Sequence, residues 1–191
     1  KRGFARKPAQ TPHDFLPRMS GAVLPLPAFS DAAAGLAALN FFPDRDLVVR
    51  RVPTLMTIGG APVPGLALES LRIAQRASTF VVKSSNASGE TAFGVKTGLV
   101  SIRVGALDIA TESDGALRVY YAGTQPQRRV PAWRVLAGTD HDEVLRGAIV
   151  FVGSSAAGMD IRATPLDAAL PGVDVHAEMA EHILSGAQLV R

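Results

Sequence analysis

The stretch that decides the fold is LRGAIVFVGSSAAG, residues 145–158. Its centre, Ala148–Val152, is an uninterrupted apolar run of strand length, which is typical of a strand buried on both faces of a sheet. The loop 153–158 that follows contains only glycine, serine and alanine. A final helical pattern begins near Gly172 and is predicted to stop at Gly186, because glycine adopts the left-handed conformation that closes a helix. The sequence therefore predicts a strand, a loop of small residues and a helix, in that order.

The rest of the chain alternates between strand and helix patterns. Further strands are expected over residues 47–58, 79–83, 99–104 and 116–121. Helices are expected over residues 31–39, 64–78 and 139–146, with a single helical turn at 134–138 and a polar turn over 108–115. Alternation of this kind predicts an α/β fold, with a mixed, largely buried sheet and helices packed on it.

The start of the chain differs from the rest in proline content and in charge. Residues 1–26 are predicted to form an extended, proline-rich arm or linker, and residues 27–191 to form one domain. Residues 1–18 carry five basic side chains and one acidic one, whereas the other 173 residues carry 15 basic and 16 acidic ones. The net charge of +3 therefore arises in the arm. The domain lacks the basic stripe of a nucleic-acid surface, and we expect no nucleic-acid partner.

Composition excludes several further classes. The chain contains no cysteine, so it has neither disulfides nor thiolate metal sites. No apolar run approaches the length of a membrane span, and no signal peptide is evident. His176 and His182 are six residues apart, which places them on different faces of a helix, and the His-x-x-x-His spacing of a zinc site is missing. The sequence predicts no metal site and no cofactor.

The small-residue loop is the first candidate binding site. Loops that follow buried strands of α/β sheets commonly contact ligands. The hydroxyls of Ser154 and Ser155 could hold a carboxylate or a phosphate, although a tight crossover without a ligand explains the same residues. No Gly-Lys-Ser/Thr follows, and Gly-x-Gly-x-x-Gly and the hydrolase pattern Gly-x-Ser-x-Gly are also absent. Because His176 is more simply a core residue than a base, a serine hydrolase is disfavoured.

A second candidate is the polar run after this loop. Asp160 and Arg162 alternate with an apolar residue, so both side chains point the same way if the segment is extended. The Arg162 guanidinium can bind a carboxylate of a ligand in a forked geometry, and Thr164 could add a hydroxyl. An internal ion pair that only fixes the loop is the open alternative.

Several blocks, in this order, resemble the CHASE2 family of extracellular sensory domains associated with cyclases and histidine kinases. The most specific are residues 145–158, then Asp160 with RATPLD at 162–167, and PGVDVHA at 171–177. Earlier blocks are GLAALN at 35–40, PDRD at 43–46, VRRVP at 49–53, LALE at 66–69, SDG at 113–115 and YYAG at 120–123. The similarity covers residues 27–191.

The resemblance implies a periplasmic sensor, not an enzyme, that recognises an unknown small-molecule or ionic signal. It implies membrane anchoring through helices outside these residues, and an adenylate cyclase, diguanylate cyclase or kinase output in the cytoplasm. It also implies that residues 27–191 are the larger, C-terminal part of the family's domain. Ligand contacts are expected at Ser154, Ser155, Asp160, Arg162 and Thr164. A structural or dimerisation module without a ligand, working as a homodimer, remains the alternative.

Overall fold

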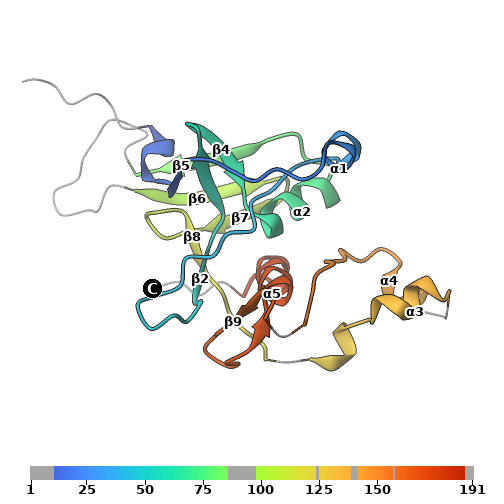
Figure 1. The fold of residues 1–191 in the computed structure, drawn as a ribbon. Helices are drawn as coiled ribbons and strands as arrows, with labels where there is room; N and C mark the ends of the chain where they lie inside the picture. The colour runs from blue at the N-terminus through green and yellow to red at the C-terminus, as the bar shows by residue number, and fades with distance from the viewer. Residues whose placement is uncertain (1–10, 86–97, 124, 139–141, 157, 188–191) are drawn as a thin grey trace, which may run out of the picture.

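The computed structural model describes residues 11–85, 98–123, 125–138, 142–156 and 158–187. It has the mixed α/β class that the sequence predicts (Figure 1). The strands do not join into one sheet, but divide among several small sheets in the described part of the chain.

The elements follow one another in an alternating order. The strands are β1 (Arg18–Met19), β2 (Arg51–Pro53), β3 (Leu55–Ile58), β4 (Ala61–Pro64), β5 (Phe80–Ser84), β6 (Leu99–Val104), β7 (Leu107–Ala110), β8 (Ala116–Arg118), β9 (Ile161–Arg162) and β10 (Leu170–Pro171). The helices are α1 (Pro27–Ala32), α2 (Leu66–Ala74), α3 (Ala132–Leu136), α4 (Asp142–Leu145) and α5 (Gly172–Ser185), with 3-10 turns η1 (Pro12–Phe15) and η2 (Pro126–Arg128).

Pairing between strands is mostly antiparallel. β5, β6 and β7 form a meander, and β3 and β4 form a hairpin that β1 extends in parallel. β2 pairs with β8, and β9 pairs with β10. The hairpin between β3 and β4 turns through Gly59 and Gly60, both with positive φ, a conformation that glycine adopts without a steric penalty.

The core lies where α2 and α5 pack together against β6 and β7. Each helix contributes one mainly apolar face to this core. The fully buried side chains of these four elements are Ala67, Leu68, Leu71, Ile102, Val104, Ile109, Val175 and Met179. Helix α5 therefore holds the domain together, and its other face is free to border a site.

Most of the predicted elements are confirmed. The pattern over 64–78 corresponds to α2, and those over 47–58, 79–83, 99–104 and 116–121 contain strands. Helix α5 ends where predicted: Gly186 has φ 69°, and its N–H donates to the Ile183 carbonyl. The helix predicted over 139–146 is present as α4, Asp142–Leu145, and residues 139–141 lie outside the described residues.

Three predictions differ from the structure. Ala148–Val152 forms no strand and pairs with no described strand, so the two-sided burial that its apolar run predicts is not met. The helix expected over 31–39 instead occupies Pro27–Ala32, because proline fits the first helical turn. Within the polar segment 108–115, residues up to Ala110 form most of β7, and the turn is confined to its end.

Part of the segment expected to be an arm contacts the domain. Leu16 is buried in the core, and β1 pairs with β3. In contrast, residues 20–26 are exposed or nearly so, with Val23 fully accessible.

Candidate functional site

A cavity of about 630 Å³ lies between α5 and the chain from Gly123 to Ser155. We call residues 122–160 the outer segment; in Figure 1 it projects beside α5 and carries α3 and α4. One wall of the cavity is α5, and the other consists of η2, the start of α3 and the extended run from Ala148 to Phe151. Apolar walls around a few polar groups are typical of small-molecule sites.

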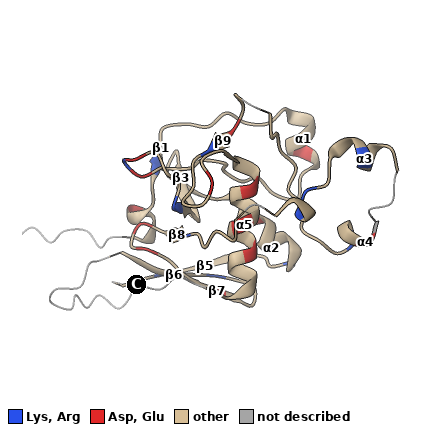
Figure 2. Ribbon diagram, turned by 90° about the horizontal axis from the view of Figure 1, so that it is seen from below, with Lys and Arg blue, Asp and Glu red and all other residues tan. Residues whose placement is uncertain are grey.

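The wall formed by α5 carries three carboxylates. Asp174, Glu178 and Glu181 are spaced i, i+4 and i+7, which places them on one side of the helix. Figure 2 shows acidic positions along α5. Val173 and Ala177 lie among them and make the same face partly apolar.

Two arginines from the outer segment pair with two of these carboxylates. Arg129 binds Asp174 at 2.6 Å, and Arg128 binds both oxygens of Glu181. Each pair is at least partly exposed, so it contributes little stability by itself. The two pairs join η2 and the residue after it to α5.

Glu178 makes no ion pair among the described residues, although the Arg128 guanidinium lies close enough to act on it electrostatically. Its carboxylate accepts the Ala122 N–H at 3.0 Å. Burial raises the pKa of Glu178, and the nearby Glu181 carboxylate raises it further, although the Ala122 hydrogen bond opposes the shift. With two arginines against three acids, the lining has one carboxylate in excess.

The small-residue loop reaches this cavity through Ser155, which lines it. Ser154 is exposed, and its Oγ accepts the Ala156 N–H at 3.2 Å. A Cβ on Gly153 would lie 2.5 Å from Cβ of Val173, so only glycine allows the loop to approach α5 this closely.

The other three predicted site residues lie away from the cavity lining. Asp160 and Arg162 form an ion pair with each other, as in the loop-fixing alternative. The Arg162 guanidinium also lies 5.5 Å from the centre of the Phe41 ring. Thr164 is buried, and its Oγ1 donates to the Asp167 carbonyl and accepts the Asp167 N–H. The structure thus brings Ser154 and Ser155 together and places Asp160, Arg162 and Thr164 around β9.

His176 is a core residue and not a partner of the serines. It is 3% exposed, and its ring lies 4.7 Å from the Phe41 ring. Among the described residues neither of its ring nitrogens has a well-formed hydrogen bond, and burial lowers its pKa to about 4 against the opposing effects of the Leu39 backbone and of Asp160. The described residues therefore contain no serine–histidine pair of the kind a hydrolase needs.

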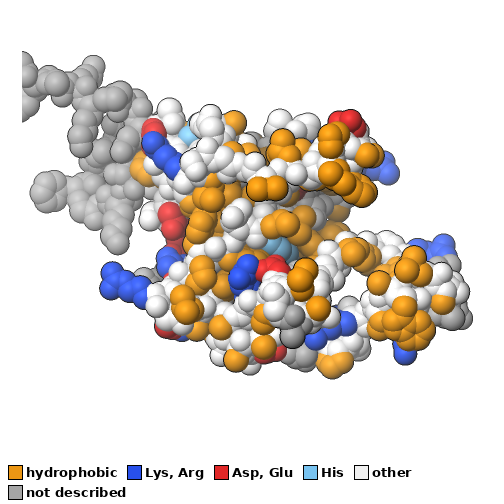
Figure 3. All heavy atoms as spheres, viewed as in Figure 1, with side chains coloured by type: hydrophobic (Ala, Val, Ile, Leu, Met, Phe, Trp, Pro, Cys, Tyr) orange, Lys and Arg blue, Asp and Glu red, His pale blue; other side chains and the backbone are white. Residues whose placement is uncertain are grey.

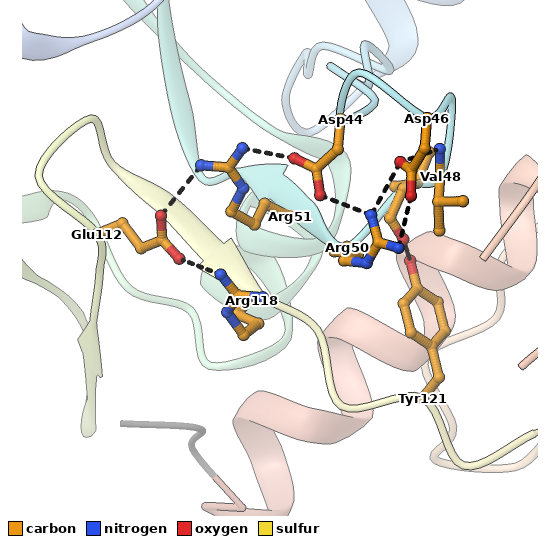
Figure 4. Close-up of polar contacts among 9 residues, drawn as sticks. Asp44, Asp46, Val48, Arg50, Arg51, Glu112, Arg118 and Tyr121 are labelled. Atoms are coloured by element: carbon orange, nitrogen blue, oxygen red, sulfur yellow. Dashed lines mark hydrogen bonds and ion pairs between the residues drawn. The ribbon is translucent and has the colours of Figure 1, made fainter. Parts of the chain in front are cut away.

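A second polar cluster lies across β2 and β8 (Figure 4). Arg51 and Arg118 are directly opposite each other in the strand register, and Glu112 accepts a hydrogen bond from both at 3.2 Å. A carboxylate between two like charges removes their repulsion. Asp44 links two arginines: its carboxylate accepts a hydrogen bond from Arg51 at 2.6 Å and another from Arg50 at 3.0 Å.

The charges of this cluster are paired with one another. Asp46 binds Arg50 through both oxygens, at 2.9 and 2.7 Å, which lowers the pKa of Asp46 to about 2. The three arginines of the cluster are balanced by Asp44, Asp46 and Glu112, so it has no free charge for a ligand. It fastens the 44–48 turn to the sheet, which is a structural role.

Sequence reasoning missed the charged groups of the cavity. The spacing of Asp174, Glu178 and Glu181 on a predicted helix was a usable signal, because it defines an acidic side next to the apolar one. No local pattern could show that Arg128 and Arg129 would meet this side, because they lie about 50 residues earlier in the chain.

The described residues contain no group of three or more histidine and acidic side chains placed to hold a metal ion. Among them, no helix combines the length and the apolar character needed to cross a bilayer.

Comparison with known proteins gives a single match. No curated protein and no solved structure matches the chain. The family model of the CHASE2 domain matches residues 3–191, which is nearly the whole chain. CHASE2 domains are extracellular, non-catalytic sensory domains of receptors associated with cyclases and kinases. The matched span confirms the resemblance that the sequence motifs indicate, and the chain belongs to the CHASE2 domain family.

Proposed function

We propose that this chain is the periplasmic sensory domain of a bacterial transmembrane receptor, and that it binds its signal in the cavity between α5 and the outer segment. The cavity carries the proposal: it measures about 630 Å³, which is within the usual range for small-molecule sites. Membrane helices and a cyclase or kinase output, outside these residues, belong to the same proposal.

Helix α5 connects the cavity to the rest of the receptor in this proposal. Its acidic side lines the cavity, and its opposite side is buried against α2. A ligand that binds one placement of α5 better than another shifts the population toward that placement. Because α5 is the last described helix, such a shift passes toward the C-terminal end of the chain.

The lining favours a signal that joins an apolar body to a positively charged or hydrogen-bond-donating group. The apolar body would lie against Phe151, Val173 and Ala177, and the polar group would reach Glu178, which forms no ion pair with any described residue. Ser155, with Ser154 beside it, is the predicted contact best placed to add a hydroxyl. Asp160, Arg162 and Thr164 would act indirectly, by fixing the loop.

The test is thermal unfolding with a panel of small metabolites of both charges. At a concentration of about 100 Kd, a true ligand adds about 2.7 kcal/mol of stability. Ala177→Trp, which fills the cavity, should abolish this shift, whereas Ala28→Trp on the exposed side of α1 should preserve it. If a metabolite stabilised both variants equally, the cavity would not be the binding site. If no metabolite raised the unfolding temperature of the unsubstituted chain, the alternative of a structural or dimerisation module without a ligand would be favoured.

A reporter fusion tests the predicted compartment separately. An enzyme that is active only in the periplasm, fused after residue 191 of the chain in its native membrane context, should be active. Activity only of a cytoplasmic reporter at that position would contradict the proposed location.

A further inference from the structure

Helix α5 holds the chain that follows β8 through two titratable side chains. The Tyr120 N–H donates to Nδ1 of His182 at 3.1 Å, and the Ala122 N–H donates to the Glu178 carboxylate at 3.0 Å. Residues i and i+4 of a helix are about 6 Å apart along its axis, and alternate residues of a strand are about 6.6 Å apart. Two side chains one turn apart on α5 therefore bind two alternate amides of this chain, in the place that a neighbouring strand would otherwise take.

The contact with Tyr120 requires an uncharged His182 ring. Because Nδ1 accepts a hydrogen bond, the neutral ring carries its proton on Nε2. A second proton can be added only at Nδ1, and the imidazolium would then turn an N–H toward the Tyr120 N–H. Two donors cannot share a hydrogen bond, so the uptake of one proton removes this link between α5 and the chain after β8.

Burial keeps the His182 ring in its neutral form. The residue is 3% exposed, and on the face shown in Figure 3 histidine occupies only small areas. Burial lowers the pKa of His182, against an opposing effect of the Ala187 backbone. The Tyr120 ring lies edge-on to the imidazole at 6.4 Å, and Tyr120 is 54% exposed. Water can therefore take over the Tyr120 amide once its bond to His182 is lost.

The charged groups around His182 form ion pairs of their own. They belong to α5 and to the elements packed on it, and the pairs are Glu69 with Arg72 on α2, Asp108 of β7 with Lys83, Arg118 of β8 with Glu112, Asp174 with Arg129, and Glu181 with Arg128. The shift in the pKa of His182 arises from burial and not from these charges.

Glu178 responds to acid in the same direction as the histidine. A protonated carboxyl accepts a hydrogen bond more weakly than a carboxylate does, so acid also weakens the contact with Ala122. Burial raises the pKa of Glu178 from its ordinary 4.5, against the hydrogen bond from Ala122. The other titratable groups that act on or with Glu178 are Glu181, Arg128, Asp174 and Tyr121. Because the pKa of the histidine is lowered and that of Glu178 is raised, both contacts weaken over neighbouring intervals of pH.

We propose that protonation of His182 at Nδ1 releases the Tyr120 amide and loosens the hold of α5 on residues 120–122, so that acidity is an input to this sensory domain. The proton comes from the solvent. His182 lies in the last turn of α5, so the change occurs at the end of the helix that leads toward the C-terminus. The proposal does not depend on a ligand in the cavity.

The test follows two neighbouring amides by hydrogen exchange in NMR. The Val119 N–H donates to the Arg50 carbonyl at 3.0 Å, a bond that no titratable group makes, so it is the internal reference for Tyr120. As the pH falls from about 7.5 to about 4.5, the protection factor of Tyr120 should fall about tenfold relative to that of Val119. The fall should have the same midpoint as the protonation of the His182 ring, read from the ring signals.

Two substitutions separate His182 from the other histidines. His182→Asn keeps an oxygen acceptor near the place of Nδ1 and takes up no proton in this range, so Tyr120 should keep its protection relative to Val119 at every pH. His13→Asn, at the exposed histidine of η1, should behave as the unsubstituted chain does. His176 is present in all three proteins, so its own titration cancels from the comparison.

Three results would overturn the proposal. The His182 ring takes up its proton while Tyr120 keeps its protection relative to Val119, or the ring stays uncharged until the whole domain unfolds. The third is a loss of Tyr120 protection in acid that is the same in His182→Asn as in the unsubstituted chain. If His182→Asn does not fold, the first two readouts decide in the unsubstituted chain alone. The Ala177→Trp experiment tests ligand binding in the cavity separately.

Discussion

Residues 49–121 and the outer segment, residues 122–160, differ in how much of their apolar side-chain surface is buried. The first region buries apolar side chains from nearly every element, and its charges are closed in ion pairs across β2 and β8. The outer segment is also rich in apolar residues, yet none of its described side chains is buried. Hydrophobic content alone therefore does not make a core. The first region supplies most of the core, which α5 completes, whereas the outer segment contributes only partly buried side chains such as Ile149 and Phe151.

The largest expected contrast comes from one substitution made in each region. Leu68→Ala removes a fully buried side chain from α2 and should lower the free energy of unfolding by about 3 kcal/mol. Leu136→Ala, at an 88% exposed position of α3, should change it by less than about 0.5 kcal/mol in dilute protein. Urea titrations measure both values. Similar losses in the two variants would mean that the outer segment has its own core.

The second contrast concerns pH and the core histidine. The folded-state pKa of His176, about 4, lies below its ordinary value of 6.5, so the unfolded chain binds more protons between these two pH values. Stability from this group is therefore full above about pH 6.5 and declines as the pH falls toward 4, by on the order of 3 kcal/mol.

Urea midpoints measured at several pH values above 4 check this expectation. His176→Phe keeps an aromatic ring against Phe41 but cannot titrate, so it should lose less stability over the same interval. The buried His182, whose pKa burial also lowers, adds a smaller contribution in the same direction that both proteins share. A pH profile unchanged by the substitution would contradict the buried, neutral state of His176.

The smallest contrast compares ion pairs. Asp44→Asn breaks the contacts with Arg50 and Arg51 in the partly buried cluster, and should lower the free energy of unfolding by about 1–2 kcal/mol. Glu181→Gln breaks the exposed pair with Arg128 in the outer segment, for which we expect a loss below about 0.5 kcal/mol. Thermal unfolding at low and high salt measures both. A larger loss for Glu181→Gln would show that the outer segment is more firmly held than its exposure indicates.

The fold was predictable from the sequence for the helices that form the core, but not for the outer segment. α2 and α5 were predictable because their apolar residues recur at helical spacing, and Gly186 marks the end of α5. The run Ala148–Val152 was predicted as a fully buried strand because its composition is that of one. Composition records which side chains favour burial, but not whether a partner strand lies within the same 191 residues, and here none is described.

The candidate site was predictable only in part. The small-residue loop was predicted to be a binding site or a tight crossover without a ligand, and the approach of Gly153 to Val173 and of Ser155 to the cavity is compatible with both. The roles of Asp160 and Arg162 could not be settled from spacing, because an internal ion pair and a ligand contact require the same residues. Glu178 was overlooked because its spacing alone does not distinguish it from Asp174 and Glu181. It differs from them because Arg128 binds Glu181 and Arg129 binds Asp174.

Hydrogen exchange of residues 149–153, compared with that of β6, tests the difference between the two regions most directly. The amides of residues 149–153 should exchange at nearly the rate of an unfolded chain, since none of them has a hydrogen-bond partner among the described residues. The amides of β6 should be strongly protected, because this strand lies between β5 and β7 and carries core side chains. Similar protection of the two segments would contradict the account.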